Sequence, residues 1–142
     1  MSGKNKEIIQ AFIEDVVNRG RVERANDLVK EDFIELDPLP GQAQGREGLK
    51  AVILGLRSSF PDMHWTVKEM VTEGEKVVTR FVWTGTHRGA FLGIPATGRS
   101  VEVKGVVIDR LEDGRMADSR MLMDTMGLMQ QLGVIPAPPS AA

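Results

Sequence analysis

The spacing of apolar residues changes near residue 60, and this change constrains the fold more than any other feature of the sequence. Before it, apolar side chains recur at helical spacing over residues 8–17, 22–29 and 46–60, with a brief extended segment at 33–36. After it they alternate with polar ones, which predicts strands over residues 64–72, 76–86, 101–111 and 115–123 and a short final helix over 124–132. Helices followed by two hairpins predict an α+β fold in which the helices cover one face of a curved antiparallel sheet.

The length of 142 residues is typical of a single domain with one core. We assign residues 1–135 to this domain and residues 136–142, which are rich in proline and alanine, to a flexible C-terminal tail. A core enclosed by a curved sheet and helices can hold a pocket for a small hydrophobic organic molecule.

Several functional classes conflict with the composition. There is no cysteine, which excludes disulfides, thiolate nucleophiles and Cys-bound metals, and the two histidines belong to no metal-binding cluster. A net charge of −2 gives no positive patch for nucleic acid. No export signal or apolar stretch long enough for a membrane span is visible, so we expect a cytoplasmic protein without a metal or other cofactor.

Strand alternation predicts which side chains enter the interior. On the strand over 101–111, Asp109 shares the apolar face with Val103 and Val107. On the strand over 76–86, Trp83 has the parity of the apolar residues, and His87 follows with the same parity. Alternation does not decide the orientation of the strand over 115–123. A carboxylic acid buried on an apolar face has a raised pKa, which suits acid–base chemistry at neutral pH.

Several motifs carry a resemblance to a known family. They are Gly85-Thr86-His87-Arg88-Gly89, the loop from Phe91 to Gly98, Glu112-Asp113-Gly114-Arg115, and the segment from Asp124 to Gly133. Together they resemble the SnoaL-like polyketide cyclase (ester cyclase) family. The resemblance implies the cone-shaped fold of nuclear transport factor 2-like proteins and a cofactor-independent intramolecular aldol condensation that uses a pocket aspartate, which Asp124 matches. Arg120 replaces a tryptophan that is frequent in this family.

The predicted catalytic residues are therefore Asp124 as the acid/base, with Asp109, His87 and Arg120 orienting or polarising the substrate. Each has a structural alternative: Asp124 as a helix N-cap, Asp109 as a buried acid paired with Arg120, and His87 as a hydrogen-bonded core residue. The predicted substrate-binding residues, which ordinary core packing explains equally well, are Phe33, Phe81, Trp83, Met121, Leu122 and Met123.

The leading functional hypothesis is a polyketide cyclase of the lyase or isomerase type. A group formed by Asp109, Arg120 and Asp124 would instead suit an epoxide hydrolase, and a polyketide hydroxylase or a non-catalytic ligand-binding module are further alternatives. We also expect a homodimer, in which apolar residues on the outer face of the sheet, such as Val78 and Val82, are buried between subunits.

Overall fold

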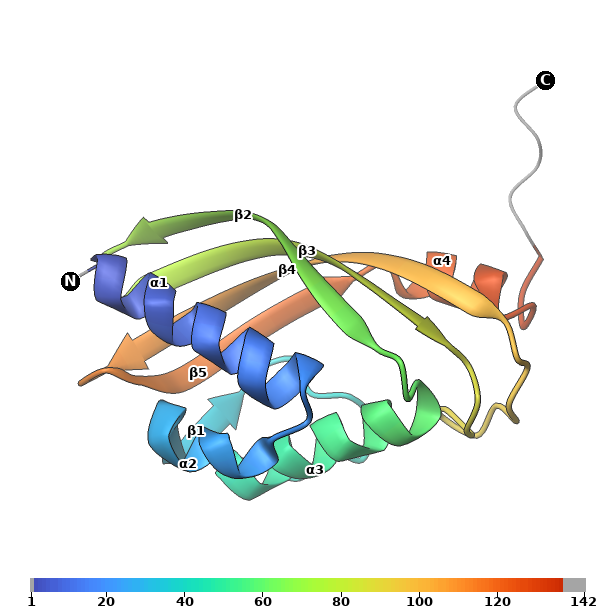
Figure 1. Cartoon of the computed structure of the whole chain (residues 1–142), viewed down its shortest axis with the longest axis horizontal. Helices are drawn as coiled ribbons and strands as arrows, with labels where there is room; N and C mark the ends of the chain where they lie inside the picture. Colours follow the sequence, from blue (N-terminus) through green and yellow to red (C-terminus); the bar gives the residue numbers. More distant parts are fainter. Residues whose placement is uncertain (1, 137–142) are drawn as a thin grey trace.

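A curved five-stranded sheet organises residues 2–136, the part of the chain that this computed structural model describes (Figure 1). The strands are β1 (Val29–Glu35), β2 (His64–Glu73), β3 (Lys76–Thr86), β4 (Ser100–Glu112) and β5 (Arg115–Met123), in the order β1-β5-β4-β3-β2. β2 to β5 are antiparallel neighbours, as predicted, whereas β1 pairs parallel to β5. Tight turns force antiparallel pairing, but β1 follows a helix and reaches the sheet edge without such a turn.

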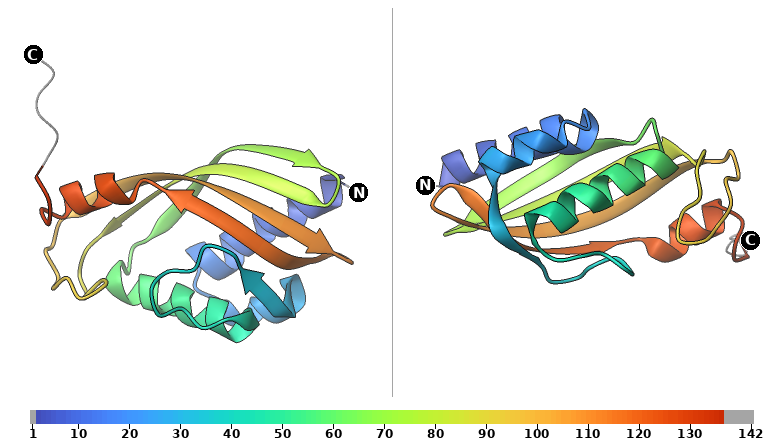
Figure 2. Two further views of the ribbon diagram at one scale, coloured as in Figure 1. Left: turned by 180° about the vertical axis from the view of Figure 1, so that it is seen from behind. Right: turned by 90° about the horizontal axis from the view of Figure 1, so that it is seen from below.

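The helices cover the concave face of the sheet. They are α1 (Ser2–Ala11), which continues into the π-helix η1 (Phe12–Asn18), the short η2 (Val22–Arg24) and α2 (Ala25–Leu28), and α3 (Gly45–Ser59). The last helix, α4 (Thr125–Gln131), lies beside β4 beyond the end of β5, where the Gln131 side chain hydrogen-bonds the backbone of Glu102. Figure 2 shows α1 and α3 side by side on the same face. The predicted helix over 8–17 is thus part of a longer one that begins at Ser2, and its second half is wound as a π-helix.

Local features of the hairpins bend the sheet. Asp113 (φ 51°) and Gly114 (φ 78°) both adopt left-handed backbone conformations, as a two-residue type I′ hairpin turn requires. On β5 the register shifts opposite Arg110, and Met116 and Ala117 are both buried although they are consecutive. Such a bulge increases strand twist and exchanges the inward and outward positions on either side of it. This explains why alternation alone did not orient β5.

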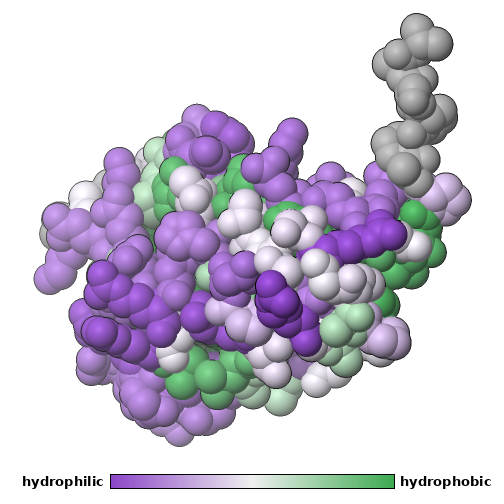
Figure 3. All heavy atoms as spheres, turned by 45° about the vertical axis from the view of Figure 1, so that its right-hand side comes forward, coloured by the Kyte–Doolittle hydropathy of each residue, from purple (hydrophilic) through white to green (hydrophobic). Residues whose placement is uncertain are grey.

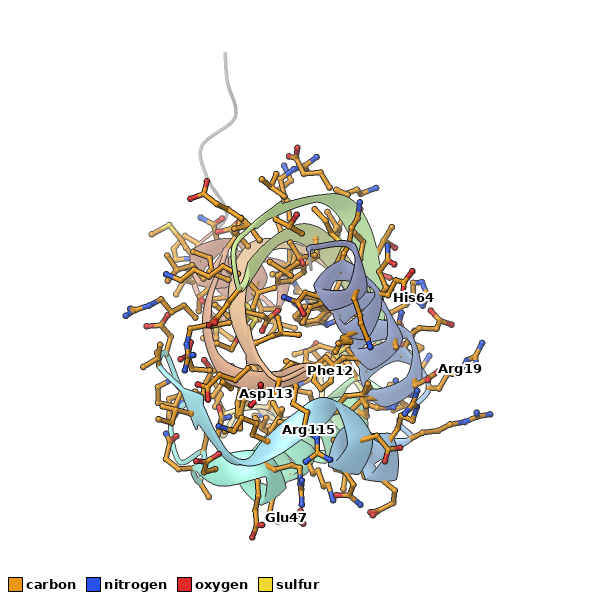
Figure 4. The ribbon with its side chains drawn as sticks, turned by 90° about the vertical axis from the view of Figure 1, so that its left-hand side faces the viewer. Phe12, Arg19, Glu47, His64, Asp113 and Arg115 are labelled. Atoms are coloured by element: carbon orange, nitrogen blue, oxygen red, sulfur yellow. The ribbon has the colours of Figure 1, made fainter. Side chains whose placement is uncertain are left out.

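The concave face encloses the core. In Figure 4, Phe12 points into the space between sheet and helices, whereas Arg19 and Glu47 project outward. The predicted α+β fold, a curved sheet closed by N-terminal helices, is confirmed, with the parallel β1 as the one difference in strand direction.

The face of the molecule seen in Figure 3 is largely hydrophilic, with separate apolar patches. On the convex face, Val106 and Leu122 are 39% and 75% exposed, and Val78 and Val82 are half-buried. The homodimer that this face suggests stays a prediction. Helices long and apolar enough to cross a membrane are absent from residues 2–136. The tail expected over 136–142 lies, apart from Pro136, outside the described residues.

Candidate active site

An apolar cavity of about 80 Å³ lies between η1, α3 and the concave face of the sheet. Its apolar wall includes Phe12, Phe33, Trp65 and Met121. A buried water needs roughly 10–15 Å³ of such space, so the cavity can accept several waters or a small part of an organic molecule. The polar side chains that line it are Glu35, Asp37, Gln42, Asp109 and Ser119.

Three of these polar residues form a row across neighbouring strands. In the strand register Glu35 of β1 pairs with Ser119 of β5, and Ser119 pairs in turn with Asp109 of β4. Neighbouring strands lie about 4.8 Å apart, which puts the backbones of Glu35 and Asp109 on the order of 10 Å apart with Ser119 between them. The register therefore directs two carboxyl groups and one hydroxyl to the same cavity wall.

Burial perturbs the carboxyl group of Asp109. The residue is only 3% exposed, and this desolvation raises its pKa from 3.8 to about 7. A hydrogen bond from the Ser119 side chain opposes the rise, and the negative charges of Glu35 and Asp118 add to it. Asp109 is therefore poised to exchange a proton near neutral pH.

Glu35 has the same character for the same main reason. Desolvation raises its pKa from 4.5 to about 7, while the backbone N–H of Asp37, 3.3 Å from Glu35 Oε2, opposes this rise. The charge of Glu35 also adds to the raised pKa of Asp109. In the neutral range this pair can hold one proton and one negative charge.

Glu35 was not identified from the sequence. Its segment contains Phe33 and Glu35 on one side and the equally apolar Ile34 and Leu36 on the other. In the structure Phe33 is buried, whereas Ile34 and Leu36 are 51% and 40% exposed. The two-residue period links Glu35 to Phe33, but only the packing of β1 against β5 and α3 decides which side is inward.

Asp124 lies outside the cavity. It is exposed, and its carboxylate accepts a hydrogen bond of 2.9 Å from the backbone N–H of Gly127, as an N-cap does. The end of β5 and the start of α4 meet at this residue, so the cap is the role that the chain direction gives it. Its predicted acid/base role is untested, and the geometry provides no contact with the cavity.

Arg120 is also directed away from the cavity. It is exposed on the convex side of β5, whereas its neighbour Ser119 is buried on the concave side. No ion pair joins Arg120 to Asp109 among the described residues, and the strand register pairs Arg120 with Ile108 and Asp109 with Ser119, so the structural alternative of an Asp109–Arg120 pair does not form. Since Asp109 is inside and Arg120 and Asp124 are outside, the arrangement that suggested an epoxide hydrolase does not form.

His87 is fully buried away from the cavity. Its Nδ1 lies 3.0 Å from Thr97 Oγ1 and accepts a hydrogen bond of 3.2 Å from the Thr97 backbone N–H. The ring stacks on Phe60, with 5.3 Å between centroids. These contacts fasten the loop after β3 to the core. They support the structural alternative for His87 over a contact with substrate.

The predicted substrate-binding residues divide into three groups. Phe33 and Met121 line the cavity. Phe81 and Trp83 are buried behind its wall, where Phe81 stacks on Trp65 with 3.8 Å between ring centroids. Leu122 and Met123 do not line the cavity: Leu122 is 75% exposed on the convex face, whereas Met123 packs against the core.

Trp65 is a cavity residue that the sequence did not single out. Its indole Nε1–H is buried and has no hydrogen-bond partner among residues 2–136. A buried donor without a partner costs free energy, and a ligand oxygen would remove that cost. Trp65 therefore brings one unpaired hydrogen-bond donor close to the cavity. Within the described residues, no group of three His, Asp or Glu side chains is placed to hold a metal ion.

Comparison with known proteins links the chain to one protein family. The model of the SnoaL-like polyketide cyclase family matches residues 7–132. The chain is similar to the aklanonic acid methyl ester cyclase DnrD of Streptomyces peucetius, with 31% identity over 110 residues, which cover 72% of this chain and 76% of the relative.

Solved structures agree with this match. TsrD from Streptomyces laurentii superimposes with a TM-score of 0.86 at 31% identity, over 94% of this chain and 97% of the neighbour. AclR, a putative hydroxylase from Streptomyces galilaeus, has a TM-score of 0.84 at 22% identity, over 98% of this chain and 87% of the neighbour. At that identity AclR supports the shared fold alone.

Proposed function

Because the chain belongs to the SnoaL-like polyketide cyclase family, we propose that it closes a ring in a hydrophobic, polyketide-like ester by an intramolecular aldol-type reaction. Asp109 is the base and Glu35 is the acid. The observation that carries the proposal is the row Glu35–Ser119–Asp109 on the wall of an apolar cavity.

The reaction begins when the Asp109 carboxylate removes a proton from the carbon next to a substrate carbonyl. The electron pair left on that carbon attacks a second carbonyl of the same molecule, so one carbon–carbon bond forms and one C=O becomes an alkoxide. Glu35 in its protonated form gives its proton to the alkoxide oxygen. The atoms of the substrate are all retained, and the proton returns from Asp109 to Glu35 to restore the starting state.

The raised pKa values support proton exchange at both groups. A base and an acid whose pKa values lie near the working pH transfer protons efficiently in both directions, and burial raises the pKa of each group to about 7. The indole N–H of Trp65 stabilises the developing negative charge on the first carbonyl oxygen. The apolar wall favours a hydrophobic substrate and excludes water from the enolate.

The test uses linear polyketide methyl esters, including aklanonic acid methyl ester. We expect a product of unchanged mass and different retention time, and deuterium uptake next to the carbonyl when the reaction runs in D₂O. Asp109→Asn is expected to lower both rates about a hundredfold to ten-thousandfold, the range of a lost general base. Absence of both ring closure and exchange over the whole panel would contradict the proposal, and ligand binding without either would indicate the non-catalytic module.

A further inference from the structure

A second, larger hollow adjoins the cavity. It has a volume of about 390 Å³ and lies between α3, the turn around Pro40-Gly41 and the loop at Ala90–Leu92. Four residues line both spaces: Leu39, Gln42, Val52 and Leu56. The outer groove, as we name this hollow, is therefore separated from Asp109 and Glu35 by a single layer of side chains.

The side chains that line the outer groove are mostly apolar. Apart from Gln42 its polar lining side chain is Ser59, whose hydroxyl already donates to the backbone oxygen of Ala90 at 2.6 Å. Leu92 projects beside it, 49% exposed and with a positive φ of 47°. A polar ligand would thus find few partners here, whereas an apolar ligand would cover exposed hydrocarbon.

Two glycines of α3 line the groove, and the fold explains only one of them. A side chain on Gly48 would collide with the backbone oxygen of Ala43, so glycine is required there. A Cβ on Gly55 would meet no atom within 4 Å. Glycine inside a helix lowers its stability by about 1 kcal/mol relative to alanine. No close packing at Gly55 explains why a larger residue is absent there.

The size of the inner cavity supplies an independent argument. Ligand pockets usually measure about 300–1,000 Å³, and 80 Å³ is too small for a polycyclic ester. The inner cavity and the outer groove together reach that range. Because the two spaces share a wall, one ligand can occupy both by displacing the side chains between them.

We propose that the outer groove binds the non-reacting end of the substrate, a planar apolar ring system that lies flat over Gly55, while the reacting end occupies the inner cavity. The inference rests on the proposed function for the identity of the reacting end. Ala51 and Gly55 lie one helical turn apart on this wall and carry little or no side chain, which leaves room for an aromatic face to approach the helix. Contacts with this distant end provide the binding energy that holds the reacting carbonyls beside the two carboxyl groups.

The experiment measures binding by calorimetry with two unreactive probes, so that it does not depend on turnover. Methyl anthraquinone-2-carboxylate has three fused rings, and methyl benzoate has one. Gly55→Leu fills the outer groove with a good helix former. Glu47→Leu is the matched control for binding, because Glu47 is exposed on α3 and lines neither space (Figure 4). It also removes the 3.0 Å ion pair with the buried Lys50, so its melting temperature is measured alongside.

We expect the wild type to prefer the three-ring probe and Gly55→Leu to weaken its binding at least about tenfold, equivalent to roughly 1.4 kcal/mol. Binding of methyl benzoate and the melting temperature of Gly55→Leu should not fall, and Glu47→Leu should bind both probes like the wild type. Equal weakening of both probes, no weakening, or no wild-type preference for three rings overturns the proposal.

The two proposals can fail separately. If no ester is cyclised while Gly55→Leu still selectively weakens the three-ring probe, the binding role of the outer groove is supported and the proposed cyclisation is contradicted. If esters are cyclised while Gly55→Leu has no selective effect, the proposed cyclisation is supported and the binding role of the outer groove is contradicted.

Discussion

Asp109→Asn tests whether the buried acid is held near neutrality by its surroundings. Asparagine has nearly the shape of a protonated aspartic acid and keeps an acceptor for Ser119, so the substitution removes only the charge. The pKa of Asp109 is about 7 in the folded protein against an ordinary value of 3.8. Between these values the folded state holds a proton that the unfolded state has released.

The sign of the effect follows from this difference. The stabilisation due to Asp109 is fully present below about pH 4 and is lost as the pH rises through about 7, because the folded state then must carry a buried charge. About three pKa units at about 1.4 kcal/mol each correspond to a loss on the order of 4 kcal/mol above pH 7. The asparagine variant does not undergo this loss.

The assay is urea unfolding of both proteins at pH 4.5 and pH 8.5. We expect similar free energies of unfolding at pH 4.5 and a variant that is more stable than the wild type by several kcal/mol at pH 8.5, together with the loss of turnover. A difference in unfolding free energy that is the same at both pH values would refute a raised pKa. A variant destabilised at both would instead indicate a buried ionic partner, which the structure does not contain for Asp109.

Three further substitutions test the assignment of roles. Glu35→Gln removes a charge that raises the pKa of Asp109, so in a ¹³C NMR titration Asp109 should titrate at lower pH while turnover falls for lack of a proton donor; an unchanged titration would separate the two groups. Ser119→Ala removes a hydrogen bond to the charged form and should raise the pKa of Asp109, moving the acid limb of the rate profile to higher pH. Asp124→Asn keeps the cap acceptor and should retain turnover and lose less than about 1 kcal/mol of stability, whereas a folded but inactive protein would return Asp124 to the acid/base role.

Much of the fold was predictable because its signals are local. Helical spacing and strand alternation depend on the backbone geometry of a few consecutive residues, and β4 keeps strict alternation along its thirteen residues. The burial of Asp109 could therefore be predicted from its own strand. The turn at Asp113-Gly114 was likewise predictable, since few residue pairs adopt its left-handed conformations readily.

The composition of the site could not be predicted in the same way. Alternation on β5 is interrupted where Met116 and Ala117 are both buried, and this reverses the outcome for Ser119 and Arg120. The family motif drew attention to Asp124, whose position after the last strand makes it a cap on the outer surface. A motif identifies a residue's position in the sequence, whereas the surrounding strands determine whether its side chain points into the cavity or toward solvent.

The sequence by itself determined the order of helices and strands and the presence of one acid on an apolar face. Only the tertiary structure decided that this acid has Glu35 as its partner, because β1 and β4 are separated by more than sixty residues and meet through β5. Strand neighbours are chosen by the packing of the whole core, since each strand pairs wherever its apolar face is best covered. A pair of carboxyl groups formed across three strands therefore exists only once the sheet has assembled.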